Sequence, residues 1–272
     1  MTMSASLVAV ENLSIGRSPS QPIVHDLSFA VRAGEVLGII GESGSGKTLT
    51  AYSIAGLLPA GLKTLSGRIQ VEGRVLGELH ADERRALAGN RIGMIFQDPL
   101  SSFNPVRTIG SLLIESGMRH RGLSRGAARH QAIAALAAVR LPDAATTIDA
   151  YPHQLSGGQR QRAMIALARF NDPALLIADE PTTALDATVQ LQILALLKGS
   201  LASSALILIS HDLRVAASMC DRILVMHRGR CVEQGDAQQI LQTPQHAYTQ
   251  RLIAAVETLT EGSVPAREAV EA

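Results

Sequence analysis

The feature that most constrains the fold is a set of short runs that are apolar at every position. Such runs are typical of parallel strands buried on both faces of a sheet, because a half-buried strand alternates apolar and polar residues. Helical patterns, for example Ala127–Val139 and Val189–Leu197, lie between the runs, and this alternation predicts an α/β fold. The runs are Val36–Ile40, Ile92–Phe96, Leu175–Ala178, Leu206–Ile209 and Ile223–Met226.

Two regions depart from this pattern. Leu7–Leu13, Ile23–Val31 and Arg68–Val75 are β-rich runs near the N-terminus, and they predict a small antiparallel sheet beside the parallel one. The stretch from Asp98 to Leu155 lacks buried-strand runs and is rich in Ala, Arg and Gly, so we expect a mostly helical insertion there. We therefore expect one domain over residues 1–260, a helical subdomain at about 98–160, and a frayed tail over 261–272.

Composition excludes several classes of protein. Apolar residues make up 46% of the chain and charged residues 18%, which excludes a highly charged, disordered chain. The net charge of +1 and the 3% of aromatic residues argue against a nucleic-acid-binding surface. Cys220 and Cys231 are too few for a disulfide scaffold. The N-terminus does not read as a signal peptide, and no apolar run is long enough to span a bilayer.

A glycine-rich loop follows the first buried strand and precedes a helical run. It fits the pattern G-x-x-x-x-G-K-[ST], in which backbone N–H groups and a helix N-terminus surround a phosphate. Lys47 is expected to reach the β- and γ-phosphates, and the Thr48 hydroxyl to bind Mg²⁺. The loop comprises Gly41, Glu42, Ser43, Gly44, Ser45, Gly46, Lys47 and Thr48.

Two acidic residues end the strand Leu175–Ala178. Asp179 stands at the carboxyl end of the strand, where α/β ligand sites form, and it suits a Mg²⁺ partner directly or through water. Glu180 is then placed to polarise a water molecule that attacks the γ-phosphate. The alternative is a solvated acid pair that caps the next helix, but the phosphate loop elsewhere in the chain favours the first interpretation.

A second glycine-rich helix start lies at Leu155–Gln159, with the sequence LSGGQ. Ser156 is a good N-cap, and Gly157 and Gly158 expose backbone N–H groups, so this is a further anion site that lacks a lysine and a metal ligand. We expect it to complete a nucleotide that another copy of the chain holds. The alternative is an ordinary capped helix.

These motifs together resemble the ATP-binding-cassette (ABC) ATPases, over about residues 7–255. Gln97 matches the Q-loop of that family, Ala184–Asp186 the D-loop, and His211 the switch histidine. The resemblance implies a P-loop NTPase core, hydrolysis of ATP with Mg²⁺, and two cassettes packed head to tail, as a homodimer or a heterodimer. It also implies that Thr48, Gln97 and Asp179 bind the metal and that Glu180, Gln97 and His211 are catalytic.

In this resemblance, the partner cassette closes the nucleotide site. Ser156, Gly157, Gly158 and Gln159 would contact the nucleotide across the interface, and Asp186 would contact the opposite site. One departure is that the family usually has an adenine-stacking aromatic just after a motif such as Leu13–Ile15. Gly16 and Arg17 stand there instead, which leaves Arg17 or His25 as candidates.

The segments Gln97–Pro105 and Thr243–Leu252 resemble the dipeptide, oligopeptide and nickel importer branch. That implies two membrane permeases as partners, an extracytoplasmic solute-binding protein acting indirectly, and a peripheral position on the cytoplasmic face of the inner membrane. We expect residues of about 98–120 to form the socket for the permeases, and peptides to be the solute, with nickel as the alternative. A soluble ABC ATPase acting on nucleic acid is less favoured, because the chain lacks the long inserts and tandem cassettes of that class. A GTPase is disfavoured, because the chain has no Asn-Lys-x-Asp motif.

Overall fold

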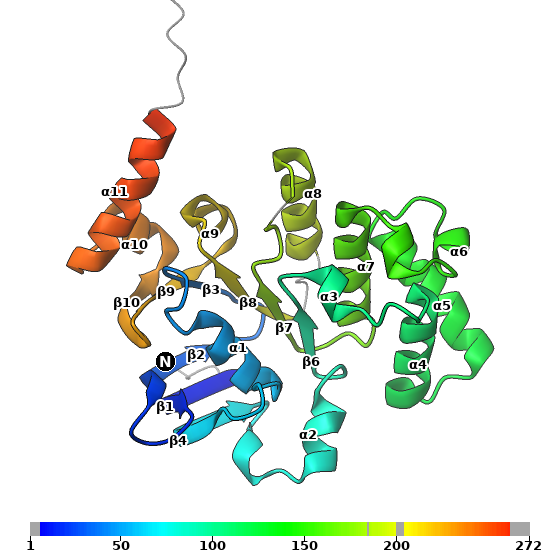
Figure 1. Cartoon of the computed structure of the whole chain (residues 1–272), viewed down its shortest axis with the longest axis horizontal. Helices are drawn as coiled ribbons and strands as arrows, with labels where there is room; N and C mark the ends of the chain where they lie inside the picture. The colour runs from blue at the N-terminus through cyan, green and yellow to red at the C-terminus, as the bar shows by residue number, and fades with distance from the viewer. Residues whose placement is uncertain (1–5, 184, 200–203, 262–272) are drawn as a thin grey trace, which may run out of the picture.

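The computed structural model describes residues 6–183, 185–199 and 204–261. It contains two β-sheets with helices between and beside them (Figure 1). The strands are β1 (Val8–Gly16), β2 (Pro22–Val31), β3 (Val36–Ile40), β4 (Lys63–Val71), β5 (Arg74–Val75), β6 (Ile92–Ile95), β7 (Leu175–Asp179), β8 (Ala205–Ser210), β9 (Arg222–His227) and β10 (Arg230–Asp236). The helices are α1 (Lys47–Ala55), α2 (Ala81–Leu87), α3 (Pro99–Ser102), α4 (Ile109–Arg121), α5 (Arg125–Ala138), α6 (Ala144–Thr147), α7 (Gly157–Arg169), α8 (Ala187–Lys198), α9 (Leu213–Met219), α10 (Ala237–Gln242) and α11 (Ala247–Glu261), with 3₁₀ turns η1 (Leu76–Glu78) and η2 (Pro152–Gln154).

The larger sheet has the strand order β10-β9-β3-β8-β7-β6. All of its pairs are parallel except β9 with β10. The predicted parallel sheet is therefore confirmed, and each of the five apolar runs is one of its strands. The edge strand β10 was not predicted, because its sequence RCVEQGD mixes polar and apolar residues and its side chains are only partly buried.

The two faces of this sheet belong to different cores. In β7, Leu176 and Ala178 face a core shared with α4, α5 and α7, whereas Leu175 and Ile177 face a core shared with α1 and the smaller sheet. All four side chains are at most 2% exposed. Burial on both faces explains why these strands are apolar at every position rather than at every second one.

The smaller sheet has the order β2-β1-β4-β5 and is antiparallel throughout, as predicted. Its third predicted run, Arg68–Val75, is wrong in its bounds. The chain turns at Glu72 and Gly73, which have φ of 50° and 76°, so the run is divided between β4 and β5, and β4 begins earlier, at Lys63. Helix α1 lies between this sheet and the larger one (Figure 1).

The helices between β6 and β7 run from α3 to α7 and lie beyond the β6 edge of the larger sheet, at the opposite end of the molecule from α10 and α11 (Figure 1). Thr108 and Ser124 cap α4 and α5 by accepting hydrogen bonds from the backbone N–H groups of Ser111 and Ala127. The predicted tail, 261–272, lies outside the described residues apart from Glu261 at the end of α11, and Ala184 also lies outside them.

One glycine is required where the helical segment meets the sheet. A Cβ at Gly93 in β6 would lie 2.2 Å from the carbonyl oxygen of Ala168, so Gly93→Ala is expected to lower the free energy of unfolding by about 1–3 kcal/mol. Gly126 in α5 is the matched control, since it has open space around it and Gly126→Ala should stabilise the helix by about 0.5–1 kcal/mol. Urea denaturation of both variants measures the difference, and equal effects would contradict this packing.

Candidate nucleotide site

The phosphate loop joins the buried strand β3 to helix α1, as the sequence predicts. Gly41 has a φ of 150°, and a Cβ there would lie 2.1 Å from the carbonyl oxygen of Met226, so only glycine fits. Lys47 is 5% exposed, and its Nζ donates hydrogen bonds of 2.8 Å to the carbonyl oxygens of both Gly41 and Glu42. The loop therefore wraps around its own ammonium group, at the N-terminal, positive end of α1.

Burial lowers the pKa of Lys47 below its ordinary value, although the carboxylates of Glu180, Asp179 and Glu42 oppose this shift. A polyanion entering the loop would add negative charge beside this ammonium and so favour its charged form. The electrostatics of the loop therefore suit a phosphate chain.

Asp179 ends β7 and is fully buried. Its Oδ1 accepts a hydrogen bond of 3.1 Å from the Thr48 hydroxyl, and its Oδ2 has no hydrogen-bond partner within the described residues. Burial raises the pKa of Asp179 to about 6. A buried carboxylate oxygen without a partner, next to a hydroxyl, is a pair of hard oxygen donors that fits Mg²⁺, which takes few protein ligands and completes its shell with water and phosphate oxygens.

Glu180 is the centre of the polar side chains around the loop. Its Oε2 accepts hydrogen bonds from Gln97 Nε2 at 3.1 Å and from the Thr183 hydroxyl at 2.9 Å, and it lies 3.1 Å from His211 Nδ1. The backbone of Glu180 has a φ of 45°, a left-handed conformation that is costly for a glutamate and is held by a hydrogen bond from its N–H to Ile209 O in β8. The three predicted catalytic side chains therefore meet at one carboxylate oxygen.

A cavity of about 640 Å³ lies in front of these residues. Its predicted members come from the phosphate loop, the end of β6, the turn after β7 and the turn after β8. Thr183, Leu49 and Ile23 also line the cavity, and the sequence analysis did not single them out. Ile23 is the β2 residue of the wall, whereas neither Arg17 nor His25 is a lining residue. The predicted lining residues are Ser43, Gly44, Gly46, Lys47, Thr48, Gln97, Glu180 and His211.

The LSGGQ residues do not line this cavity in a single chain. Ser156 caps α7: its hydroxyl accepts from the Gln159 N–H at 3.3 Å, and the Gln159 side chain accepts from the Ser156 N–H at 2.9 Å. Ser156 and Gly157 are exposed. A Cβ at Gly158 would lie 3.0 Å from the side chain of Val189 in α8, so this turn adjoins the helix that Asp186 caps through the Val189 N–H.

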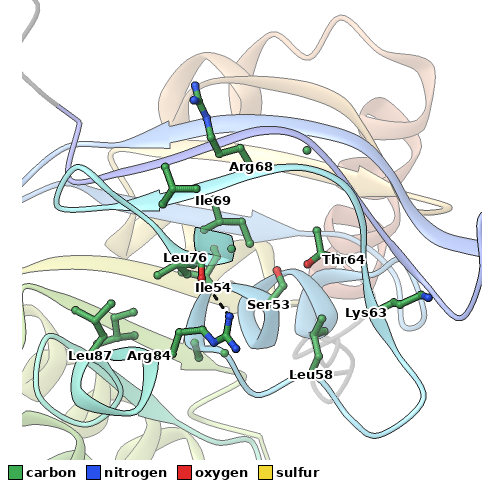
Figure 2. A pocket seen from close by; sticks show the side chains of 16 residues that line it. Ser53, Ile54, Leu58, Lys63, Thr64, Arg68, Ile69, Leu76, Arg84 and Leu87 are labelled. Carbon is green, nitrogen blue, oxygen red and sulfur yellow. Dashed lines mark hydrogen bonds between the residues drawn. The ribbon is translucent and has the colours of Figure 1, made fainter. Parts of the chain in front are cut away.

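Two further cavities contain none of the predicted nucleotide-binding residues. One, of about 460 Å³, lies between α1, β4 and α2, and Figure 2 shows the Arg84 side chain reaching toward the carbonyl oxygen of Leu76 within it. The other, of about 290 Å³, is lined mainly by apolar residues from the end of α1, from β6, from the region of α3 and from α7, including Leu57, Phe103 and Met164.

Comparison with known proteins places these features in a family. Residues 24–183 match the family model described as ABC transporter. The chain is 46% identical to a putative peptide import ATP-binding protein of Brucella abortus, over 96% of this chain and 81% of that protein. It is also 46% identical to the oligopeptide transport ATP-binding protein OppD of Salmonella typhimurium, over 88% of this chain and 72% of that one.

Other relatives are longer than this chain. It is 46% identical to the uncharacterized ABC transporter ATP-binding protein YejF of Escherichia coli over 92% of its own length, but it spans only 49% of YejF. Among solved structures, the dimeric post-hydrolysis state of the ATP-binding cassette MJ0796, bound to ADP and Pi, superposes with a TM-score of 0.75 at 26% identity, covering 85% of this chain and 98% of that one. A bacterial Atm1-family ABC exporter with ATP bound superposes with a TM-score of 0.74 at 28% identity, covering 94% and 43%.

The buried Asp179 gives a pH-dependent prediction. Because its pKa is raised on folding, the charged form costs stability, and this cost should grow as the pH rises from about 4 to about 6 and then stay constant. Asp179→Asn removes the charge, so without nucleotide or Mg²⁺ it should raise the free energy of unfolding at pH 8 by up to about 3 kcal/mol, and by much less at pH 4.5.

Urea denaturation at the two pH values measures this difference. Asp82→Asn is the control, because the Asp82 side chain is 90% exposed and should give the same small effect at both pH values. A gain from Asp179→Asn that does not change with pH would contradict the assignment.

Proposed function

The chain belongs to the ABC transporter family, and on that premise we propose that it is the ATP-hydrolysing subunit of an importer for peptides. The observation that carries the proposal is the meeting of Lys47, Thr48 and Glu180 at one cavity beside the buried Asp179. The names of the relatives, which are import and transport ATP-binding proteins for peptides, support the solute class.

In this proposal the phosphate loop binds the triphosphate of ATP. Lys47 exchanges its hydrogen bonds to the carbonyl oxygens of Gly41 and Glu42 for the β- and γ-phosphates, and the N–H groups of the loop and of the α1 N-terminus face the same oxygens. Ile23 contributes an apolar surface for the base, which requires no aromatic residue at Gly16 or Arg17. Mg²⁺, held by Thr48, Asp179 and Gln97 directly or through water, would neutralise phosphate charge.

The attacking water is oriented by the side chains around Glu180. The carboxylate accepts a proton from water, while Gln97, Thr183 and His211 fix its position through Oε2 and leave Oε1 free of these three contacts. The left-handed backbone of Glu180 aims the side chain from the end of β7 into the cavity. His211, whose side chain is 61% exposed, is accessible to the γ-phosphate.

A second cassette completes the site. Each chain carries the phosphate loop at one place and an exposed Ser156–Gly157 turn at another, and the turn does not line the chain's own cavity. In a head-to-tail dimer the turn of each chain would cover the nucleotide of the other, with the α7 N-terminus directed at the γ-phosphate. ATP binding then draws the cassettes together, and hydrolysis releases them.

The membrane partners dock on the helical side of the chain. The apolar cleft lined by Leu57, Phe103 and Met164 lies between α1, β6, α3 and α7, and Leu57 and Leu100 at its margin are 42% and 48% exposed. Such exposed leucines beside a cleft are typical of a protein-binding surface. We place the permease contact here, within the predicted socket of residues 98–120 extended by Leu57. Gln97 leads from this region into the nucleotide site.

These partners make the chain a peripheral subunit on the cytoplasmic face of the inner membrane, associated indirectly with an extracytoplasmic solute-binding protein. None of the helices in the described parts of the chain has the length and apolar character needed to cross a bilayer. Reconstitution with the permeases, with ATP turnover measured in the presence of peptides or of nickel, tests the solute.

Replacing the proposed base separates binding from hydrolysis. Glu180→Gln keeps the size and hydrogen bonding of the side chain but cannot accept the proton, so we expect ATP binding to remain and turnover to fall by about 100-fold or more. The variant should accumulate as an ATP-bound dimer in size-exclusion chromatography. Lys47→Ala is the contrasting variant, since it should lose most nucleotide affinity in calorimetry. Turnover like that of the wild type in Glu180→Gln would remove Glu180 from this role.

The socket gives a second prediction. Leu100→Ser should leave ATP turnover of the purified subunit unchanged and reduce transport in the reconstituted importer, because it removes apolar contact area without touching the nucleotide cavity. Leu191→Ser on α8 is the control, as Leu191 is also a strongly exposed leucine and lies outside the socket. If Leu100→Ser abolished both turnover and transport, the assignment of this surface would be wrong.

A further inference from the structure

A tyrosine from the C-terminal helix reaches the phosphate loop. The hydroxyl of Tyr248, at the start of α11, accepts a hydrogen bond of 3.1 Å from the backbone N–H of Glu42, a residue 206 positions away in sequence. The same hydroxyl is hydrogen bonded to the Glu42 carboxylate. Burial raises the pKa of Tyr248, so the phenol keeps its proton at neutral pH and can act as donor to the carboxylate while it accepts from the N–H.

Glu42 in turn fixes the parts of the loop that meet phosphate. Its carbonyl oxygen accepts a hydrogen bond of 2.8 Å from Lys47 Nζ and one of 3.3 Å from the Ser45 N–H. The Glu42 residue itself is exposed, and Ser43 and Gly44 after it are exposed as well. Packing therefore gives this part of the loop little support, and the contact with Tyr248 supplies a fixed point.

Tyr248 is held more rigidly than the loop. It is 4% exposed and belongs to the core that contains Ile40, Val225 and Ile240. Its ring lies against His227 with the ring centres 3.9 Å apart, and its N–H donates to His246 Nδ1 at 3.1 Å.

The segment before Tyr248 is also tied down. The Glu233 carboxylate in β10 accepts hydrogen bonds from the backbone N–H groups of Gln245 and His246, at 2.7 and 3.1 Å. The hydroxyl of Tyr248 is therefore presented to the loop from a fixed position.

We infer that Tyr248 is a positioning residue for ATP binding: it anchors Glu42 and thereby holds the phosphate loop and Lys47 in the geometry that receives the triphosphate. This role rests on the nucleotide site proposed above. It makes the segment from Thr243 to Tyr248, which lies far from the loop in sequence, part of the nucleotide-binding machinery.

Removing only the hydroxyl tests this inference. Tyr248→Phe keeps the ring on His227 and leaves the Glu42 N–H without its acceptor, so the loop loses its fixed point before ATP binds. In the full-length chain with Mg²⁺, we expect the Kd for ATP, measured by calorimetry, to rise about five- to tenfold. The kcat at saturating ATP should stay within about twofold, because Gln97, Thr183 and His211 hold Glu180 without help from Tyr248.

Matched variants separate a positioning role from a structural one. Tyr151→Phe removes the hydroxyl of an exposed tyrosine outside the loop and should leave the Kd unchanged. Glu42→Ala, at an exposed position that tolerates substitution, removes the acceptor of the phenol proton and should raise the Kd in the same direction but less. In the Tyr248→Phe background, Glu42→Ala should add little.

The outcomes are distinct. A Kd for Tyr248→Phe within twofold of the wild type would overturn the inference, and so would a lowered Tm with unchanged Kd, or a fall in kcat alone. Should Tyr248→Phe fail to fold, an unchanged Kd in Glu42→Ala would overturn it. If the wild-type chain itself bound no ATP, the proposed function would fail, and the role of Tyr248 would fall with it.

Discussion

Burial of the parallel sheet on both faces is the constraint on which the rest of the structure depends. Helices cover one face, and α1 with the antiparallel sheet covers the other, so the strands have nowhere to place polar side chains along their length. Polar residues are therefore displaced to the strand ends, and parallel strands bring those ends to one edge. Gly41 after β3, Asp179 and Glu180 at the end of β7, and His211 after β8 meet there for that reason.

The sequence predicts this part of the molecule well, because local patterns encode it. The apolar runs mark the buried strands, and the loop from Gly41 to Thr48 has a pattern that few other functions require. Patterns of this kind fail where pairing or packing depends on distant residues. β10 is a polar edge strand that forms only because β9 offers a partner, and the division of Arg68–Val75 into β4 and β5 follows from the backbone at Glu72 and Gly73.

The candidate site shows the same division. The fold class and family are confirmed, whereas the roles of the site residues stay predictions. Lys47, Thr48 and Glu180 could be selected from the sequence because each lies in or beside a motif. The wall formed by Ile23 and Thr183 and the contact from Tyr248 could not, since they depend on how β2 and α11 pack against the loop. The exposed Ser156 turn was recognised as an anion site without a complete set of ligands, and in the structure it lies outside the chain's own cavity.

The segment after β7 links these separate regions. Thr183 hydrogen bonds to Glu180 at the cavity, and Asp186, a close neighbour in sequence, begins the helix whose Val189 lies against Gly158. In a two-fold assembly of such chains, this short stretch would lie next to the cleaved bond of one nucleotide and next to the turn that covers the other. The two ATP molecules would then not be independent, and turnover would be expected to depend on ATP concentration cooperatively, with spent product at one site altering the affinity of its twin.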